Sequence, residues 1–130
     1  MKYKVTVNET IIEELWSMIE DCAGKPEEDK YAEGFFTALH KSWMKNNGKK
    51  HWKLSLTLKQ IKACREQAWS QADFIDYQQI ATIKADFYNR YSTTEDRAEG
   101  KPQLMECQKS RRALLKLVKE CDAILNPVVA

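Results

Sequence analysis

Residues 73–91 read DFIDYQQIATIKADFYNRY, and this stretch decides the fold class. Its apolar and aromatic residues recur every three to four positions, which is the period of an amphipathic α-helix. The residues on this face are Phe74, Tyr77, Ile80, Phe87, Tyr88 and Tyr91. It is the richest aromatic face in the chain, so we expect this helix, from about Asp73 to Tyr91, at the centre of the core.

Helical patterns continue on both sides of this stretch. Upstream, capping signals and apolar periodicity predict helices from Thr10 to Gly24 and from Pro26 to Gly48, and a third that begins after Thr57. Downstream, the polar residues 92–101 predict a loop, in which Ser92-x-x-Glu95 could start one extra helical turn, and the last helix begins near Pro102. The chain is therefore predicted to be all-α, as a single compact bundle of about five helices.

The second predicted helix has one unusual position. Gly34 lies in its interior, where glycine costs about 1 kcal/mol relative to alanine, so another backbone is expected close by. The predicted buried face of this helix consists of Tyr31, Ala32, Phe35, Phe36, Leu39 and Trp43.

Two short segments alternate polar and apolar residues, as half-buried strands do. The apolar positions are Tyr3, Val5 and Val7 in one segment and Trp52, Leu54, Leu56 and Leu58 in the other. The first predicts a short N-terminal β-strand. Either the two segments pair as a small sheet, or Leu56 and Leu58 lead directly into the next helix.

Length and composition indicate an ordinary globular domain that spans residues 1–130. A chain of 130 residues buries a sizeable core without disulfides or metal ions. The content of 43% hydrophobic and 31% charged residues, with four glycines and three prolines, argues against a mostly β or disordered chain. No apolar run is long enough to cross a bilayer and none follows the N-terminus, so we expect a cytoplasmic location.

The four cysteines are far apart in the sequence, and none forms a C-x-x-C motif. Each falls on a predicted apolar helix face, so we expect four buried thiols in a reducing compartment rather than a disulfide or a zinc site. The cysteines are Cys22, Cys64, Cys107 and Cys121.

Charge is divided into blocks along the chain. Residues 34–65 contain no Asp or Glu but hold seven lysines, Arg65 and both histidines, whereas residues 9–33 contain nine carboxylates and two lysines. Although the net charge is only +2, acidic and basic residues are separated along the chain, and such a charge dipole indicates a binding surface. The predicted partner-binding residues are Lys41, Lys45, Lys49, Lys50, Trp52, Lys53 and Lys62. Trp52 is expected to be the desolvated anchor and the lysines its rim.

An acidic face is the alternative contact surface, for a partner whose own surface is basic. It is formed by Glu13, Glu14, Glu20 and Asp21 on the outer side of the first predicted helix.

Two cations interrupt predicted apolar faces. Lys84 lies within the aromatic face of residues 73–91, and Arg111 lies within the apolar seam of the last helix. A charge there must extend to solvent, pair with a carboxylate or meet an anionic ligand, because an unpaired buried charge costs several kcal/mol. An anion pocket around Lys84 and Arg111 is therefore a further alternative site.

No motif for catalysis, cofactor binding or metal binding is found, so the chain is expected not to be an enzyme and to carry no cofactor. The first hypothesis is a small non-enzymatic helical binding protein that acts stoichiometrically on a macromolecular partner, most readily another protein. Inhibitors, immunity factors, adaptors and accessory proteins of phages or mobile elements are of this kind. The alternatives are non-specific single-stranded DNA or RNA binding through the basic surface of residues 41–62, and a receptor for a small anionic ligand.

Overall fold

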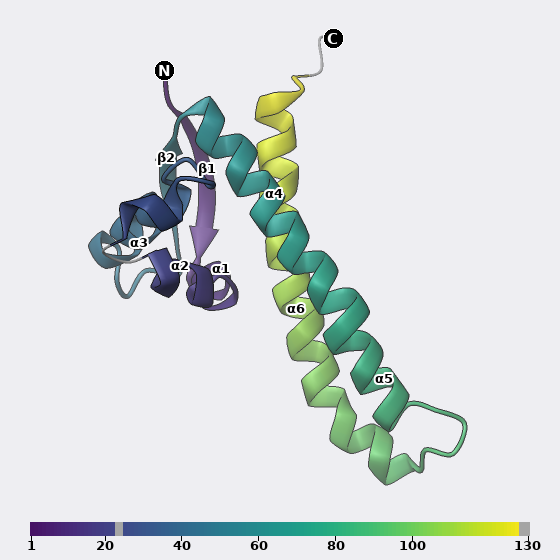
Figure 1. The fold of residues 1–130 in the computed structure, drawn as a ribbon. Helices are drawn as coiled ribbons and strands as arrows, with labels where there is room; N and C mark the ends of the chain where they lie inside the picture. Colours follow the sequence, from purple (N-terminus) through teal and green to yellow (C-terminus); the bar gives the residue numbers. More distant parts are fainter. Residues whose placement is uncertain (23–24, 128–130) are drawn as a thin grey trace.

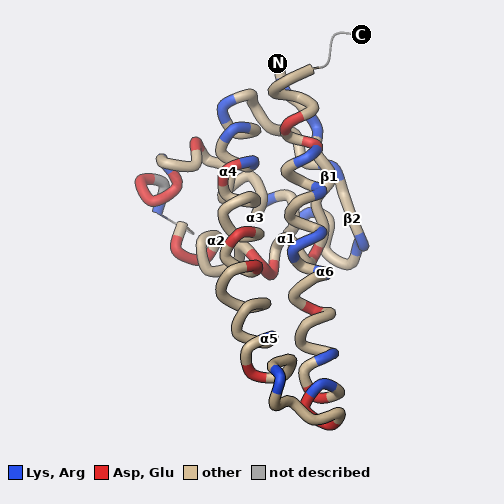
Figure 2. The backbone as a smooth tube through the Cα atoms, turned by 90° about the vertical axis from the view of Figure 1, so that its right-hand side faces the viewer, with Lys and Arg blue, Asp and Glu red and all other residues tan. Residues whose placement is uncertain are grey.

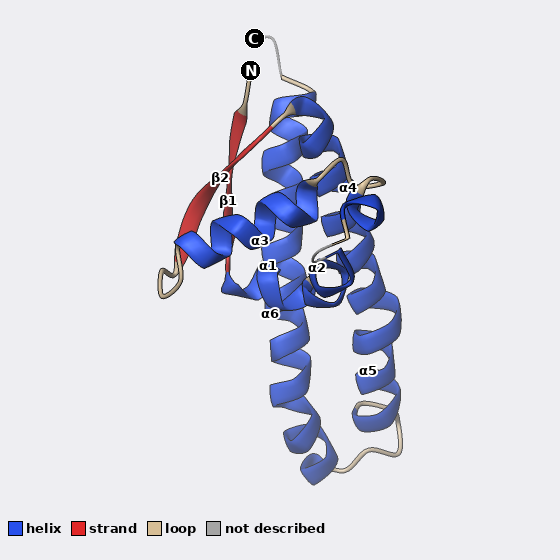
Figure 3. Ribbon diagram, turned by 60° about the vertical axis from the view of Figure 1, so that its left-hand side comes forward, coloured by secondary structure: helices blue, strands red, loops and turns tan. Residues whose placement is uncertain are grey.

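The two longest helical segments lie side by side and antiparallel (Figure 1). The remaining helices and a small sheet gather beside the half of this pair that is near both termini, so the other half protrudes (Figures 1 and 3). The computed structural model describes residues 1–22 and 25–127. Within these ranges the chain is mostly helical with a two-stranded antiparallel sheet, which confirms the predicted fold class and the N-terminal strand.

One continuous rod replaces the predicted third and fourth helices. It consists of α4 (Leu58–Phe74), the π-helical segment η2 (Ile75–Ile80) and α5 (Ala81–Phe87). The predicted break before Asp73 is wrong, because the π-helical turn changes the register without ending the helix. A π-helix bonds residue i to i+5, so Ile80 takes the buried position that follows Ile75.

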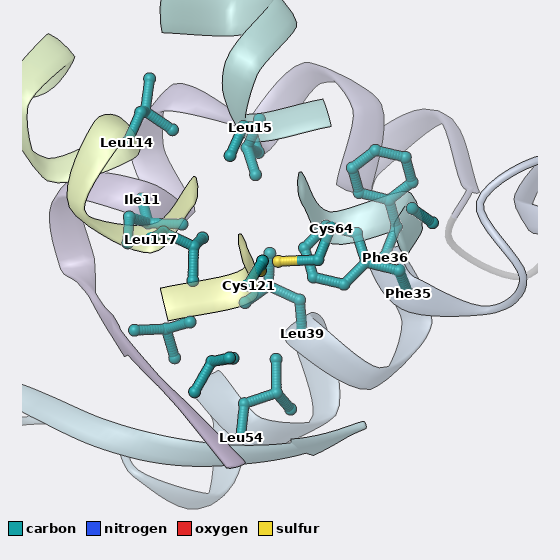
Figure 4. Close-up of a cluster of buried hydrophobic side chains, with 14 of the residues drawn as sticks. Ile11, Leu15, Phe35, Phe36, Leu39, Leu54, Cys64, Leu114, Leu117 and Cys121 are labelled. Atoms are coloured by element: carbon teal, nitrogen blue, oxygen red, sulfur yellow. The ribbon is translucent and has the colours of Figure 1, made fainter. Parts of the chain in front are cut away.

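The aromatic residues of this stretch lie outside the buried core. Phe74, Tyr77 and Tyr91 are 41%, 57% and 78% exposed, so the prediction that their face forms the centre of the core is wrong. The buried positions on this part of the rod are isoleucines. The core is mainly aliphatic and lies where α4 and α6 meet the N-terminal elements (Figure 4). Its fully buried side chains include Val5, Ile11, Leu15, Phe35, Leu39, Leu56, Ile61, Leu114 and Leu117.

The last helix, α6 (Thr94–Leu125), begins eight residues before the expected Pro102, which lies inside it. Thr93 and Asp96 form a capping box that starts it, so the loop predicted for residues 92–101 is wrong. Gly100 lets this early part of α6 approach α5 closely. A Cβ at position 100 would lie 2.5 Å from the Cβ of Phe87.

The first predicted helix is two short helices, α1 (Glu9–Glu14) and α2 (Trp16–Cys22), separated at Leu15. Its N-cap is Asn8 rather than Thr10, because the Asn8 side chain accepts a hydrogen bond from the backbone N–H of Ile11 at 3.0 Å. The predicted stop at Gly24 lies outside the described residues.

The second predicted helix is also divided. It consists of a 3₁₀ turn, η1 (Pro26–Asp29), and a helix, α3 (Phe35–Lys45), separated by Gly34 in the left-handed conformation with φ of 82°. Gly34 is therefore a break and not an interior position, and Tyr31 before it is 96% exposed instead of buried. The buried Asp29 carboxylate holds the junction, because it accepts hydrogen bonds from the backbone N–H groups of Phe36 and Thr37 at 3.3 and 2.9 Å.

The sheet pairs β1 (Tyr3–Asn8) with β2 (His51–Leu56), with Val5 opposite Leu54 and Val7 opposite Trp52. These four side chains are buried on the inner face. Leu58 follows the strand and is the first residue of α4, so both alternatives for residues 52–58 are partly correct.

The cysteines are free thiols, and three of the four are buried as predicted. Cys64 on α4 and Cys121 on α6 point toward each other in the core (Figure 4). Their hydrogen bond and the burial of the site raise the pKa of the Cys64 thiol well above its usual value. Cys107 is the exception, because it is only partly buried.

Among the helices of the described residues, none combines the length and the apolar character that crossing a membrane requires.

Candidate basic interface

The predicted binding lysines are exposed, but the structure spreads them over several surfaces. Lys41 on α3 lines a hollow together with Asp29, Lys30 and Glu33, so charges of both signs lie around it. Lys50 lines a different groove, against α6. The predicted single patch is therefore divided. Its other lysines are Lys45 at the end of α3, Lys49 in the turn after it, Lys53 on β2 and Lys62 on α4.

Trp52 is a core residue rather than a surface anchor. Its side chain is 5% exposed, and its indole N–H donates to the Ser42 hydroxyl at 3.0 Å. The strand alternation that predicted β2 also explains this placement, because Trp52 shares the inner face with Leu54 and Leu56. The prediction that Trp52 is available to a partner is wrong.

The outer face of the sheet is polar and basic. The strand register places Lys4 opposite Ser55, Thr6 opposite Lys53, and Asn8 opposite His51. The Lys53 ammonium donates to the Thr6 hydroxyl oxygen at 2.7 Å, which holds one cation across the two strands. This face carries positive charge with no carboxylate among its cross-strand pairs.

A second row of cations lies on α6, and the sequence predictions missed it. Lys109, Arg112, Lys116 and Lys119 are spaced three, four and three residues apart, so they share one side of the helix, and all four are exposed. Residues 107–119 contain no Asp or Glu. Residues 34–65 also lack Asp and Glu, so the same sequence signal marks both the earlier basic segment and this row of α6.

The two cationic surfaces meet where β1 packs against α6. The backbone N–H of Thr6 donates to the Glu120 carboxylate at 3.1 Å, and the groove beside this contact is lined by Lys50 and Lys116. We call the combined surface the basic face (Figure 2). It consists of Lys4, Lys50, His51, Lys53, Lys109, Arg112, Lys116 and Lys119. Across residues 1–22 and 25–127 the ion pairs are Arg65–Asp122 and Arg111–Asp76, so none neutralises a member of this face.

The predicted acidic face lies on α1 and α2. Glu13, Glu20 and Asp21 are exposed, whereas Glu14 is half-buried and accepts a hydrogen bond from the Gln71 amide at 3.3 Å. Figure 2 shows carboxylates gathered around α2 and the segment that follows it, away from β2. The acidic segment thus lies apart from the sheet, although Asp29 and Glu33 share a hollow with Lys41 of the basic segment.

The structure does not bring Lys84 and Arg111 into one pocket. Arg111 faces Asp76 on η2, with 3.9 Å between its Nε and the carboxylate, while Lys84 is exposed on α5. Asp76 and Lys84 are eight residues apart on the rod, which corresponds to roughly 12 Å along a helix axis. Of the three expected arrangements, Arg111 therefore adopts the pairing with a carboxylate, and Lys84 adopts the extension into solvent.

Metal chemistry receives no support from the side-chain arrangement. In the part of the chain that the structure describes, no three His, Cys, Asp or Glu side chains are grouped so that they could hold a metal ion.

Compared with protein-family models, curated protein sequences and solved structures, the chain has no significant match. The geometry of the chain itself is therefore the basis for a functional proposal.

Proposed function

We propose that the chain is a non-enzymatic binding protein that holds an anionic macromolecule stoichiometrically on the basic face. One observation carries this proposal: cations from β1, β2 and α6 gather on one surface, and among the described residues none of them forms an ion pair with a carboxylate. Like charges repel, so such a concentration weakens the folded state slightly and is useful where a negative partner compensates it.

The character of the basic face favours a nucleic acid backbone as the partner. Protein interfaces obtain most of their affinity from buried Trp, Tyr and Arg anchors, and the expected anchor Trp52 is inside the core. The basic face has no exposed Trp, Tyr or Phe, so base stacking is also unsupported. The binding mode that is left is attraction between lysine ammonium groups and phosphates. This mode depends little on base sequence.

The test is oligonucleotide binding by fluorescence anisotropy, with labelled duplex and single strands over a range of salt concentrations. Changing Arg112, Lys116 and Lys119 to Glu should weaken binding at least about tenfold and reduce the slope of log K against log salt by about 3, because three phosphate contacts are lost. Circular dichroism checks that the variant is folded.

The matched control changes Lys41, Lys59 and Lys62 to Glu, which alters net charge equally at exposed positions outside the basic face. This variant should retain most of the affinity. Equal losses in both variants would mean that only net charge matters. A loss confined to the control would assign binding to the surface of Lys41, Lys59 and Lys62 on α3 and α4.

A protein partner is the second candidate, and a separate surface favours it. Trp69, Phe74 and Tyr77 are 46%, 41% and 57% exposed on α4 and η2, and the rings of Phe74 and Tyr77 pack edge to face at 6.1 Å. Exposed aromatic residues of this kind are typical interface anchors. If the parent protein binds neither oligonucleotide even at low salt, this hypothesis replaces the first.

A further inference from the structure

The groove between the sheet and α6 has features that the rest of the basic face lacks. It has a volume of about 240 Å³, and it is formed by residues from β1, β2 and α6 that are distant in sequence. Ile11, Ala113 and Leu117 supply its apolar part. Its polar lining, which we call the junction groove set, consists of Thr6, Asn8, Lys50, His51, Lys116 and Glu120.

Most polar groups of this set are hydrogen-bond donors. The Asn8 side-chain oxygen already accepts the N–H of Ile11, which leaves its NH₂ group to donate. The Thr6 hydroxyl oxygen accepts from Lys53, which leaves its O–H to donate. Lys50 and Lys116 add two ammonium groups. The groove therefore offers donors from four side chains at the meeting point of the two cationic surfaces.

The one carboxylate of the groove is already engaged. Glu120 accepts the backbone N–H of Thr6 at 3.1 Å, and this contact fastens β1 to α6. The groove holds one carboxylate and the two ammonium groups of Lys50 and Lys116, so its positive charge exceeds its negative charge. The partner that fits such a site has several acceptor oxygens, carries negative charge and has no need to donate.

We propose that the junction groove is a seat for a phosphate group. An ionised phosphate diester has only acceptor oxygens, so each donor of the groove can find a partner on it. The volume is several times the ~30 Å³ that one water molecule occupies in the liquid, which leaves room for a phosphate and part of an attached sugar. This inference rests on the proposed function where the phosphate belongs to a nucleic acid, and it places one backbone phosphate at a defined point of the basic face.

The experiment is an amide ¹H–¹⁵N NMR titration of the full chain with three probes: inorganic phosphate, a thymidine dinucleotide and a single-stranded oligonucleotide. All three should shift the amide signals of Asn8, Lys50 and His51 in a saturable manner. Lys116→Gln should weaken the response to inorganic phosphate at least about fivefold, because it removes one charged donor while retaining most of the side chain. Lys50→Gln should act in the same direction.

The matched control is Lys119→Gln, which changes an exposed cation of the same α6 row that does not line the groove. It should leave the response to inorganic phosphate within about twofold of the parent. Shifts spread evenly over the basic face, or equal losses in Lys116→Gln and Lys119→Gln, would overturn the phosphate seat.

The outcomes separate this inference from the proposed function. If Lys116→Gln and Lys119→Gln weaken the response to inorganic phosphate equally while the parent protein still binds the oligonucleotide, the seat is removed and the function is left intact. Saturable groove shifts with inorganic phosphate, combined with no oligonucleotide binding, support the seat, assign it to a free phosphate compound and overturn the proposed function.

Discussion

Trp52 is buried on the inner face of β2, where its indole N–H donates to the Ser42 hydroxyl. Its neighbours in sequence are His51 and Lys53, which suggested an aromatic anchor within a basic surface. In the strand, however, adjacent side chains point to opposite faces, so His51 and Lys53 face solvent while Trp52 packs inward. Basic residues and the aromatic residue share a segment but not a surface.

The first residue-scale prediction concerns Trp52. Trp52→Ala should lower the free energy of unfolding by about 3 to 5 kcal/mol, because a large buried side chain is removed and a cavity remains. Trp52→Phe should cost less, since it retains an aromatic ring but loses the hydrogen bond to Ser42, and Lys53→Ala should change stability by less than about 1 kcal/mol. Urea denaturation followed by circular dichroism measures all three. A loss below about 1 kcal/mol for Trp52→Ala would place this residue outside the core.

The cysteines give a second residue-scale prediction. Partial burial is the largest cause that raises the pKa of the Cys107 thiol, and the negative charges of Glu14 and Glu106 add to it. Cys107 is nevertheless the most accessible cysteine, because the other three are buried. The thiolate is the reactive species, so a buried thiol with a raised pKa reacts slowly. Iodoacetamide should therefore modify Cys107 first in native buffer, and Cys22, Cys64 and Cys121 only once urea unfolds the chain. Mass spectrometry of peptides gives the order, and native labelling of Cys64 as fast as Cys107 would contradict it.

At the scale of elements, the protruding half of the helical pair depends on close contact between α5 and α6. Gly100 is buried against Phe87. The absence of a side chain at position 100 allows the two backbones to approach. The glycine that lowers helix propensity in α6 therefore improves its packing.

The element-scale prediction follows from this contact. Helix propensity alone predicts that Gly100→Ala stabilises by about 1 kcal/mol. We expect the opposite sign, a loss of about 1 to 3 kcal/mol, because the new Cβ would lie 2.5 Å from the Cβ of Phe87 and the helices must separate. Ala98→Gly at an exposed position of α6 is the control and should cost about 1 kcal/mol. Stabilisation by Gly100→Ala in chemical denaturation would show that α5 and α6 are not in close contact.

At the scale of the whole molecule, charge is the property that folding reorganises most. The acid-free residues 34–65 are spread over α3, β2 and α4, and part of them faces carboxylates of η1 and the following turn. The cations of α6, about sixty residues further along the chain, join Lys50 and Lys53 instead. The residues that form a charged block in the sequence are thus not the same residues that form the charged face in the folded chain.

Local signals predicted much of the fold. The alternation of Val5, Val7, Trp52 and Leu54 predicted both strands, and the cap at Thr57 correctly starts α4. The errors occurred where local signals compete. Ser92-x-x-Glu95 and Pro102 both resemble helix starts, and the helix begins one residue after the first of them, with the Thr93–Asp96 capping box and with Gly100 packed against Phe87. The π-helical register of η2 has no local marker in the sequence.

The sequence by itself determined the helical class, the N-terminal strand and the separation of acidic from basic segments, because periodicity and charge are properties of neighbouring residues. Only the tertiary structure decided which faces are buried and which cations act together. An apolar face at helical spacing meets the core only if a partner helix covers it, as α6 covers Ile75 and leaves Tyr77 exposed. Likewise, Lys50 and Lys116 share a groove because Glu120 binds the Thr6 backbone and brings the strand to the helix.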